Sequence, residues 1–554
     1  MQRVSDFIDT DIEPNSKIST AIILLSYCNI ASDMNLGRSV VTRCAALAAL
    51  PELTPINQLW WQLRLGYYHE LFGDYSSSRR SLDSAVDLWQ SHGFRQLTGT
   101  FLLIASYQVS SAASEGDLSR TSIWYERIVA AADTRRPMDA WHVDEAKVQL
   151  EALRGNYRTV AEIAEDTVAR TAATEVTYIQ ILAVVNLAIG RAALGDDASA
   201  RDALARLRSL ISGTCFSYFE CVEKFLEAYF SLKHGNRTEA LALLCDALEF
   251  AREQSFSYPQ TVRFSSIVGE LFATALRAGI KFDYVEETIR RLGIRAPADA
   301  PASWPWPVKV RTLGSFEIVC DGKQLDFGRK APKKPLALLK CLIAFGGRNV
   351  PEYRIADALW PGEDADLAVK ALDVTLVRLR ELLGQAHAVI TSDGVLSLNA
   401  NLFWTDVWAF EAAAQGAAQC ENENNGRLGE AMALYAGEFL PADTAPAWSL
   451  KLRERLRGTF LRLVENSAKR LENRAHWEAA IDCYERGLTA DDLAEPFYQG
   501  LMRCYSALGR HTEAMSVYRK LRQILSVVLG MAPSESTQAL ARKLQAENPA
   551  QPGD

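Results

Sequence analysis

The sequence lacks the residue patterns that mark most metalloproteins and most enzymes. It has only seven histidines and ten cysteines in 554 residues, with no CxxC pair, no HExxH motif and no Cys/His spacing typical of a metal site. Scattered cysteines of this kind are typical of a reducing compartment. There is also no GxxxxGK[ST], GxGxxG or GxSxG motif, and Gly322-Lys323 reads as a hairpin turn. We therefore expect no enzyme activity, no metal and no cofactor.

Long apolar runs are also absent. The most apolar stretch, Tyr178–Gly195, is interrupted by Gln180, Asn186 and Arg191, so it predicts a buried helix and not a membrane span. The first residues, Met1–Glu13, are polar and acidic and do not resemble a signal peptide. These features predict a cytoplasmic protein with no membrane partner.

The overall charge excludes one class of protein. A net charge of −8 argues against a surface that binds nucleic acid everywhere, because such binding needs positive charge, which can be local. Hydrophobic residues make up 48% and charged residues 23%, which is ordinary for a globular protein. A chain of 554 residues predicts about three domains.

The N-terminal half contains a repeat. A glycine followed by Asp or Asn separates two apolar helix patterns five times, at intervals of 43, 39, 40 and 40 residues. The glycine can end one helix and the next residue can cap the following one. The pattern predicts a superhelical stack of helix pairs from about Ser16 to Leu292. The five dipeptides are Gly73-Asp74, Gly116-Asp117, Gly155-Asn156, Gly195-Asp196 and Gly235-Asn236.

This array resembles known repeats. Leu232–Leu248 resembles the second half of a tetratricopeptide (TPR) repeat, and the array is similar to the helical regulatory domain of MalT-like regulators. Those relatives often carry an ATPase module, which this sequence lacks, so the chain is either a truncated relative or one that lost the module. We assign 1–293 as a regulatory domain. Its aromatic segments, Trp60, Trp61, Tyr67, Tyr68, Phe216, Tyr218 and Phe219, fit a ligand pocket or, as their helical spacing favours, a plain core.

A change of composition separates the two halves of the chain. Ile294–Pro307 is rich in proline and alanine and has no periodicity, which predicts a stiff, extended linker. Trp304 and Trp306 are expected to hold this linker against one neighbour.

The order of elements in 308–400 predicts a winged helix. Short β-rich segments come first, three helices follow, and a hairpin closed by Ser392-Asp393-Gly394 forms the wing. Pro335 is expected at the first position of the first helix. The predicted strands are Val308–Thr312, Ser315–Cys320, Gln324–Phe327, Ala388–Thr391 and Val395–Leu398, and the second and third helices are Glu352–Trp360 and Ala368–Gly384.

The third helix has two contrasting faces. Its apolar stripe is Val369, Leu372, Leu376, Leu379 and Leu383. The opposite face carries Lys370, Val374, Val377 and Arg378. Arginine can bind guanine and apolar groups can contact the thymine methyl in a DNA major groove, although the two valines could equally pack on a neighbouring helix.

A basic cluster precedes the first of these helices. It consists of Arg329, Lys330, Lys333 and Lys334, and it fits either phosphate contacts or a solvated basic turn. The whole of 308–400 holds 13 Lys and Arg against 11 Asp and Glu, a modest excess for a DNA-binding domain.

A second repeat array follows at 401–545, with 546–554 expected to be a disordered tail. Ala480 and Tyr484 recur as Ala514 and Tyr518, an offset of 34 residues, which is the tetratricopeptide period. An earlier helical unit, Asp406–Tyr435, leads into this array. The fold class predicted for the whole chain is mainly α: a TPR-like solenoid, an α+β winged helix and a TPR-like helical domain.

Several motifs in 308–545 resemble one family. LGSFEIVCDG, ALLKCLIAFGGRNV, IADALWPG and ALDVTLVRLRELLG are similar to the Streptomyces antibiotic regulatory protein (SARP) type of activator. That family joins an OmpR/PhoB-type winged helix to a bacterial transcriptional activator domain. The resemblance implies that Thr375 and Arg380 join the DNA-reading set, that Ser392 in the wing meets phosphate, and that Pro361–Asp366, with Glu363, Asp364 and Asp366, faces RNA polymerase. A solvated loop is the alternative for that last segment.

The resemblance implies a function. The chain would be a transcriptional activator that binds double-stranded promoter DNA as a homodimer on repeated half-sites and recruits RNA polymerase. The N-terminal array would sense an unknown small-molecule or protein effector. The rival hypothesis is a protein-interaction scaffold whose winged helix binds protein, and Glu381 on the outward face of the third helix favours it slightly.

Overall fold

The chain folds into two compact units, Met1–Trp304 and Pro305–Asp554, and the division falls inside the proline-rich segment. The computed structural model describes residues 8, 10, 12–31, 33–172, 176–214, 216–253, 266–297, 299–327, 331–419, 426–443 and 446–547. Trp304 and Trp306, one on each side of the division, are both buried. The predicted fold class, mainly α with a winged helix between two helical regions, is confirmed.

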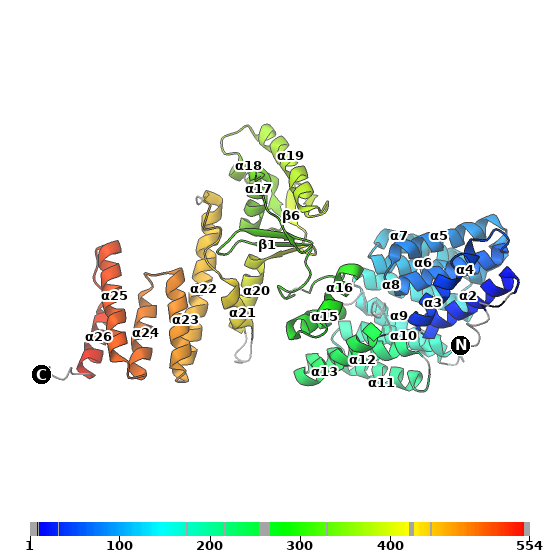
Figure 1. The fold of residues 1–554 in the computed structure, drawn as a ribbon, viewed down its shortest axis with the longest axis horizontal. Helices are drawn as coiled ribbons and strands as arrows, with labels where there is room; N and C mark the ends of the chain where they lie inside the picture. Colours follow the sequence, from blue (N-terminus) through cyan, green and yellow to red (C-terminus); the bar gives the residue numbers. More distant parts are fainter. Residues whose placement is uncertain are drawn as a thin grey trace. The chain divides into compact units, whose positions relative to one another are not determined.

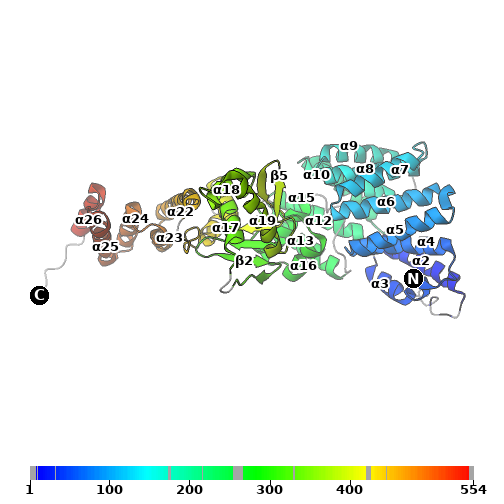
Figure 2. The ribbon, with the colours of Figure 1, turned by 90° about the horizontal axis from the view of Figure 1, so that it is seen from above.

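The first unit is a stack of paired helices. Figure 2 shows α2, α4, α5, α6, α8 and α9 layered in chain order. The bounds are α2 Pro14–Ala31, α3 Met34–Cys44, α4 Pro55–Leu71, α5 Tyr75–Ser91, α6 Thr98–Glu115, α7 Leu118–Ala131, α8 Pro137–Arg154, α9 Tyr157–Thr171, α10 Thr177–Ala193, α11 Asp197–Ile211, α12 Ser217–Lys233, α13 Arg237–Glu253, α15 Ser266–Ala278 and α16 Phe282–Leu292.

The Gly-Asp and Gly-Asn dipeptides lie at the turns inside the pairs, as the sequence predicts. All five glycines have φ between 75° and 80°, the left-handed conformation that ends a helix. Asp74, Asp117 and Asp196 then cap the next helix, each accepting a hydrogen bond from the backbone N–H three residues ahead. The apolar stretch Tyr178–Gly195 is the buried helix α10.

The second unit begins with the winged helix (Figure 1). One sheet has the order β3-β2-β1-β7 and the other has the order β4-β6-β5. The bounds are β1 Val308–Arg311, β2 Glu317–Cys320, β3 Lys323–Gln324, α17 Lys333–Ala344, β4 Val350–Pro351, α18 Glu352–Leu359, α19 Ala365–Leu383, β5 Val389–Ser392, β6 Val395–Leu398 and β7 Phe403–Thr405.

Three details differ from the sequence prediction. Pro335 is the third residue of α17 and not the first, which the helix tolerates because its first-turn N–H groups have no partner inside the helix. The third strand was predicted at Gln324–Phe327, but β3 is Lys323–Gln324 and shares only Gln324 with it. Strand β7, which pairs parallel with β1 between Val308 and Phe403, was not predicted, because three residues show no usable periodicity.

The remaining helices form the C-terminal array. Their bounds are α20 Asp406–Gln419, α21 Gly426–Leu434, α22 Ala447–Asn473, α23 Trp477–Ala490, α24 Glu495–Ala507, α25 His511–Leu529 and α26 Glu535–Glu547. Ala480 and Ala514, the equivalent small residues of the two repeats, are both completely buried. They occupy the close helix contacts that the 34-residue period predicts.

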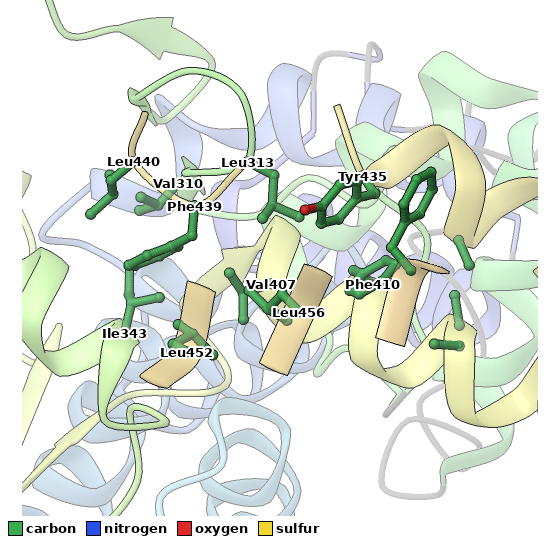
Figure 3. Close-up of a cluster of buried hydrophobic side chains, with 14 of the residues drawn as sticks. Val310, Leu313, Ile343, Val407, Phe410, Tyr435, Phe439, Leu440, Leu452 and Leu456 are labelled. Carbon is green, nitrogen blue, oxygen red and sulfur yellow. The ribbon is translucent and has the colours of Figure 1, made fainter. Parts of the chain in front are cut away.

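A single hydrophobic core joins the winged helix to the first helices of the C-terminal array. Figure 3 shows Val310, Ile343, Phe439 and Leu452 in one cluster, which continues to Tyr435 and Phe410. The sequence predicts a boundary between the winged helix and the C-terminal array at residue 400, but the hydrophobic core extends across it. The domain boundary predicted from the sequence is therefore not a boundary in the hydrophobic core.

Hydrogen bonds strengthen the same junction. The buried carboxylate of Asp406 accepts from Thr312 N at 2.6 Å, Leu313 N at 2.8 Å and Thr312 Oγ1 at 2.8 Å. Leu440 N donates to Thr312 O at 2.8 Å, and Lys340 Nζ lies 2.8 Å from Asp443 Oδ2. These contacts join the winged helix to the helices that follow it.

The described residues contain no candidate membrane span and no candidate metal cluster. None of their helices combines the length and the apolar character needed to cross a membrane. The same residues contain no cluster of three or more His, Cys, Asp or Glu side chains arranged to hold a metal ion. Every cysteine that the structure describes is a free thiol.

Candidate nucleic-acid interface

Helix α19 packs on the winged-helix core through one stripe. Leu372, Leu376, Leu379 and Leu383 are buried, as predicted. Val369 was placed in this stripe but is 37% exposed, and Ala368, one residue earlier, is buried in its place. Helical spacing of three and four residues puts Ala368 on the same face as Leu372 and Leu376, and the helix begins at Ala365, where Asp364 caps it by accepting from the N–H of Asp366 at 3.0 Å.

The opposite face of α19 is open to solvent. Lys370, Val374, Val377 and Arg378 are all exposed there, and each of the two valines is 52% exposed. The valines therefore do not pack on a neighbouring helix of this chain. Spacings of three and four residues place these side chains on one strip of the helix surface. The strip offers two cations and two methyl-bearing groups to a partner.

The charges around this strip are mixed. Asp366, Asp373 and Glu381 are also exposed on α19. Three carboxylates therefore accompany the two cations of the strip, and the helix alone does not provide a positive surface. Affinity for a polyanion needs further cations from the surrounding elements.

Two residues predicted to read DNA have other roles in the structure. Thr375 is only 6% exposed, and its hydroxyl donates to Ala371 O at 2.6 Å. Arg380 is half-buried, and its Nη2 donates to Val389 O at 2.8 Å and to Thr391 Oγ1 at 3.1 Å. Thr375 thus belongs to the helix interior, and Arg380 fastens the wing to α19. Both corrections have the same cause, since helical spacing alone does not show which flank a neighbouring element covers.

The wing is a tight two-residue hairpin. Asp393 and Gly394 have φ of 49° and 73°, which matches a type I′ turn. Ser392 is exposed beside the turn, and its hydroxyl lies 3.1 Å from Asp393 Oδ2. Glu352 N donates to Gly394 O at 3.0 Å, so the start of α18 supports the turn.

That contact also identifies a residue that sequence analysis missed. Tyr353, the second residue of α18, is 70% exposed next to the wing. It is among the most exposed large apolar side chains of the described residues. The sequence could not distinguish it from a core aromatic, because its exposure depends on how α18 meets the wing.

Only part of the predicted basic cluster can be placed. Arg329 and Lys330 lie outside the described residues. Lys333 is exposed at the first position of α17. Lys334 is engaged, because its Nζ donates to Leu359 O at 2.7 Å and lies 4.8 Å from the ring of Trp360. It therefore completes the C-terminal end of α18.

The predicted acidic loop is exposed between α18 and α19. Glu363, Asp364 and Asp366 are all accessible. Asp364 and Asp366 have a local role as well, since carboxylates at a helix start offset its dipole. Glu363 has no such role, and its backbone N–H donates to Trp360 O at 3.2 Å.

Comparison with known families identifies the helices that follow this interface. Residues 405–545 match the family model described as "Bacterial transcriptional activator domain". This region is therefore similar to a bacterial transcriptional activator domain. Its match begins at Thr405, one residue before Asp406, so the activator domain and the winged helix meet at the buried junction described above.

Two curated relatives match a longer stretch of the chain than the family model does. The regulatory protein AfsR of Streptomyces coelicolor is 28% identical over 245 residues, which is 43% of this chain and 24% of AfsR. AfsR of Streptomyces griseus is 30% identical over 214 residues, which is 38% of this chain and 22% of that protein. The matched part thus spans about a quarter of the length of these relatives. Together with the activator domain, they confirm the resemblance to SARP-type regulators.

One solved structure is also similar. Mycobacterium tuberculosis EmbR, in complex with a low-affinity phosphopeptide, is 21% identical. The match covers 44% of this chain and 66% of EmbR, with a TM-score of 0.36.

Proposed function

We propose that this protein is a cytoplasmic transcriptional activator that binds promoter DNA through α19 and the wing and recruits RNA polymerase. The N-terminal array would regulate it by sensing an effector. The observation that carries the proposal is the exposed strip Lys370, Val374, Val377 and Arg378 on the third helix of a winged helix, joined directly to an activator domain.

The chemistry of the strip suits a major groove. A guanidinium can bind O6 and N7 of guanine together, and a valine methyl group can contact the thymine methyl. The core of a protein–protein interface is expected to be a continuous apolar surface. The two exposed valines of this strip are instead flanked by Lys370 and Arg378. Lys333 and the wing would supply phosphate contacts on either side.

The acidic neighbours of the strip favour a partly protein-binding role. Glu363 and Asp366 are exposed ahead of the strip and would repel phosphate. They fit a basic surface on RNA polymerase beside the promoter. Binding as a homodimer on repeated half-sites remains part of the proposal, because one winged helix contacts too few base pairs for strong selection.

The test begins with the full chain and genomic DNA. Fragments retained by the purified protein would be sequenced, and the enriched site used in gel-shift titrations at several salt concentrations. Val377→Asp should weaken specific binding at least tenfold, because a carboxylate would replace a methyl contact in the groove. The matched control is Val129→Asp on α7, the same change at a residue that is 47% exposed in the other unit.

The outcomes separate the two hypotheses. Enrichment of one sequence, together with loss of binding in Val377→Asp only, would support the promoter-binding activator. If the full chain enriches no sequence, or if both variants bind like the natural protein, α19 is not a DNA reader. The exposed carboxylates Asp373 and Glu381 would then support the scaffold hypothesis.

A further inference from the structure

The N-terminal unit contains a large cavity that is partly open to solvent. Its volume is about 390 Å³, within the range of small-molecule sites. Most of its wall comes from α4, α6, α8 and α10, the first helices of successive pairs. Those helices line the inner face of a helical-repeat stack, which is where such stacks bind their partners.

The apolar part of the wall is aromatic and flat. The rings of Tyr67 and Tyr107 stack with centroids 4.4 Å apart and planes inclined by 7°. The ring of Tyr178 meets that of Phe219 edge to face at 5.8 Å, and Trp141 completes this lining. Such surfaces favour planar rings over bulky aliphatic groups, because aromatic pairs stack or meet at their edges.

One end of the cavity is positively charged and rich in donors. Arg64 lines it, and its guanidinium lies 5.3 Å from the centre of the Trp60 ring. Its Nη1 donates to the hydroxyl of Tyr107 at 2.8 Å, and its Nε is buried with no hydrogen-bond partner in the described structure. Since Tyr107 accepts from Arg64, its own O–H can donate into the cavity. A guanidinium in this setting is stabilised by an anion.

Other polar groups are also partly unsatisfied. Asn29 is 4% exposed and lines the cavity, and its Oδ1 has no hydrogen-bond partner in the described structure. Glu145 accepts from Gln149 Nε2 at 3.0 Å and Asn186 Nδ2 at 2.8 Å, and burial raises the pKa of its carboxyl. Burial also lowers the pKa of His142 to about 4, so this imidazole is neutral at pH 7.

We propose that this cavity binds a small planar aromatic anion, whose acidic group is held by Arg64 and the hydroxyl of Tyr107 and whose ring lies among the aromatic walls. The amide and carboxyl groups of Asn29, Gln149 and Glu145 select hydroxyl or amide substituents on that ring. This site deepens the effector-sensing role proposed above. It is independent of DNA binding, so either proposal can fail without the other.

The test uses two dyes with one ring system. Anilinonaphthalene sulfonate is a planar aromatic anion whose fluorescence rises in apolar sites, and N-phenyl-naphthylamine is the same ring system without the sulfonate. Both are titrated into the full chain without DNA. The sulfonate should bind at one site per chain, about tenfold or more tighter than the neutral dye, because a charge-assisted hydrogen bond is involved.

Variants then locate the site and its charge. Arg64→Gln should bring the two affinities close together, and Tyr107→Phe should do so partly while keeping the stacked ring. Leu103→Trp, which fills the cavity, should weaken both dyes. Arg127→Gln is the matched control, because this arginine lies on α7 against Trp124 and does not line the cavity.

Three results would overturn the proposal. One is equal affinity of the natural chain for both dyes. The second is a preference for the sulfonate that survives in both Arg64→Gln and Tyr107→Phe, with circular dichroism showing that the variants are folded. The third is sulfonate binding that does not saturate, or that Arg127→Gln weakens as much as Arg64→Gln does, since the dye would then bind the outer surface.

Discussion

Removing the carboxylate of Asp406 should loosen the junction between the winged helix and the activator domain. Its two oxygens accept four hydrogen bonds, from Thr312 N, Thr312 Oγ1, Leu313 N and Val407 N, at 2.6 to 2.9 Å. Thr312 is completely buried, and Leu313 and Val407 are 2% and 1% exposed, so water cannot easily replace the lost acceptor. Asp406→Ala would leave these donors buried and unsatisfied.

The size of the effect follows from that count. One buried donor without a partner costs about 1–3 kcal/mol, but four do not add fully, because the deletion also relieves the desolvation of a buried charge. We expect Asp406→Ala to lower the local stability by about 3–5 kcal/mol. Asp406→Asn keeps one acceptor oxygen and should cost about half as much, and Thr312→Val, which removes only the hydroxyl, about 1 kcal/mol.

Hydrogen exchange followed by mass spectrometry on the full chain measures this directly. Peptides that cover β1 and the start of α20 should exchange faster in Asp406→Ala, while those from α4 to α13 should not change. A loss below about 1 kcal/mol, or equal losses for the Asn and Ala variants, would refute the reasoning, because the number of acceptor oxygens would then not matter.

The pH dependence of the same contact has a definite sign. Burial raises the pKa of Asp406 above its unfolded value, despite the four hydrogen bonds that lower it. A raised carboxyl pKa means that the stability from this side chain falls as the pH rises through the folded pKa. Asp406→Asn, which does not titrate, should remove that fall in the exchange data for β1.

Four further predictions test other parts of the molecule. Arg378→Ala should cost about 1–3 kcal/mol of specific DNA binding in gel shifts; unchanged binding would remove α19 from the groove. Burial lowers the pKa of His142 from 6.5 to about 4, so the N-terminal unit should lose about 2 kcal/mol between pH 7 and pH 5, measured by urea unfolding, and His142→Gln should lose less. Gly500→Ala should destabilise the activator domain by about 1–3 kcal/mol, because the new Cβ would lie 2.3 Å from the buried ring of Tyr484, which outweighs the helix propensity that alanine gains; a higher melting temperature would contradict this. Deleting 1–293 should leave a folded fragment that binds the same DNA but no longer responds to an effector, and a folded fragment that cannot bind DNA would make the N-terminal array part of the DNA-binding assembly.

The local order of the chain was predictable from sequence. Glycine at a helix end and Asp or Asn after it act within a few residues, so the repeat turns such as Gly116-Asp117 could be located without a structure. The Asp393-Gly394 turn of the wing is equally local. The outward face of α19 was recognisable for the same reason, since Lys370, Val374 and Val377 follow the helical period.

Tertiary structure decided what each element covers. Thr375 and Arg380 were predicted to read DNA, but their polar groups form hydrogen bonds inside the protein. The hydroxyl of Thr375 donates to the backbone of its own helix, and the guanidinium of Arg380 donates to the wing. The exposure of Tyr353 was not predictable, because only the packing of α18 leaves that ring uncovered. The cavity around Arg64 and Tyr107 needed at least four helices to close it, so the period of any one helix could only show aromatics typical of a core. The periodicity of a sequence indicates on which face of a helix a side chain lies. Only the packing of the folded chain shows what that side chain contacts.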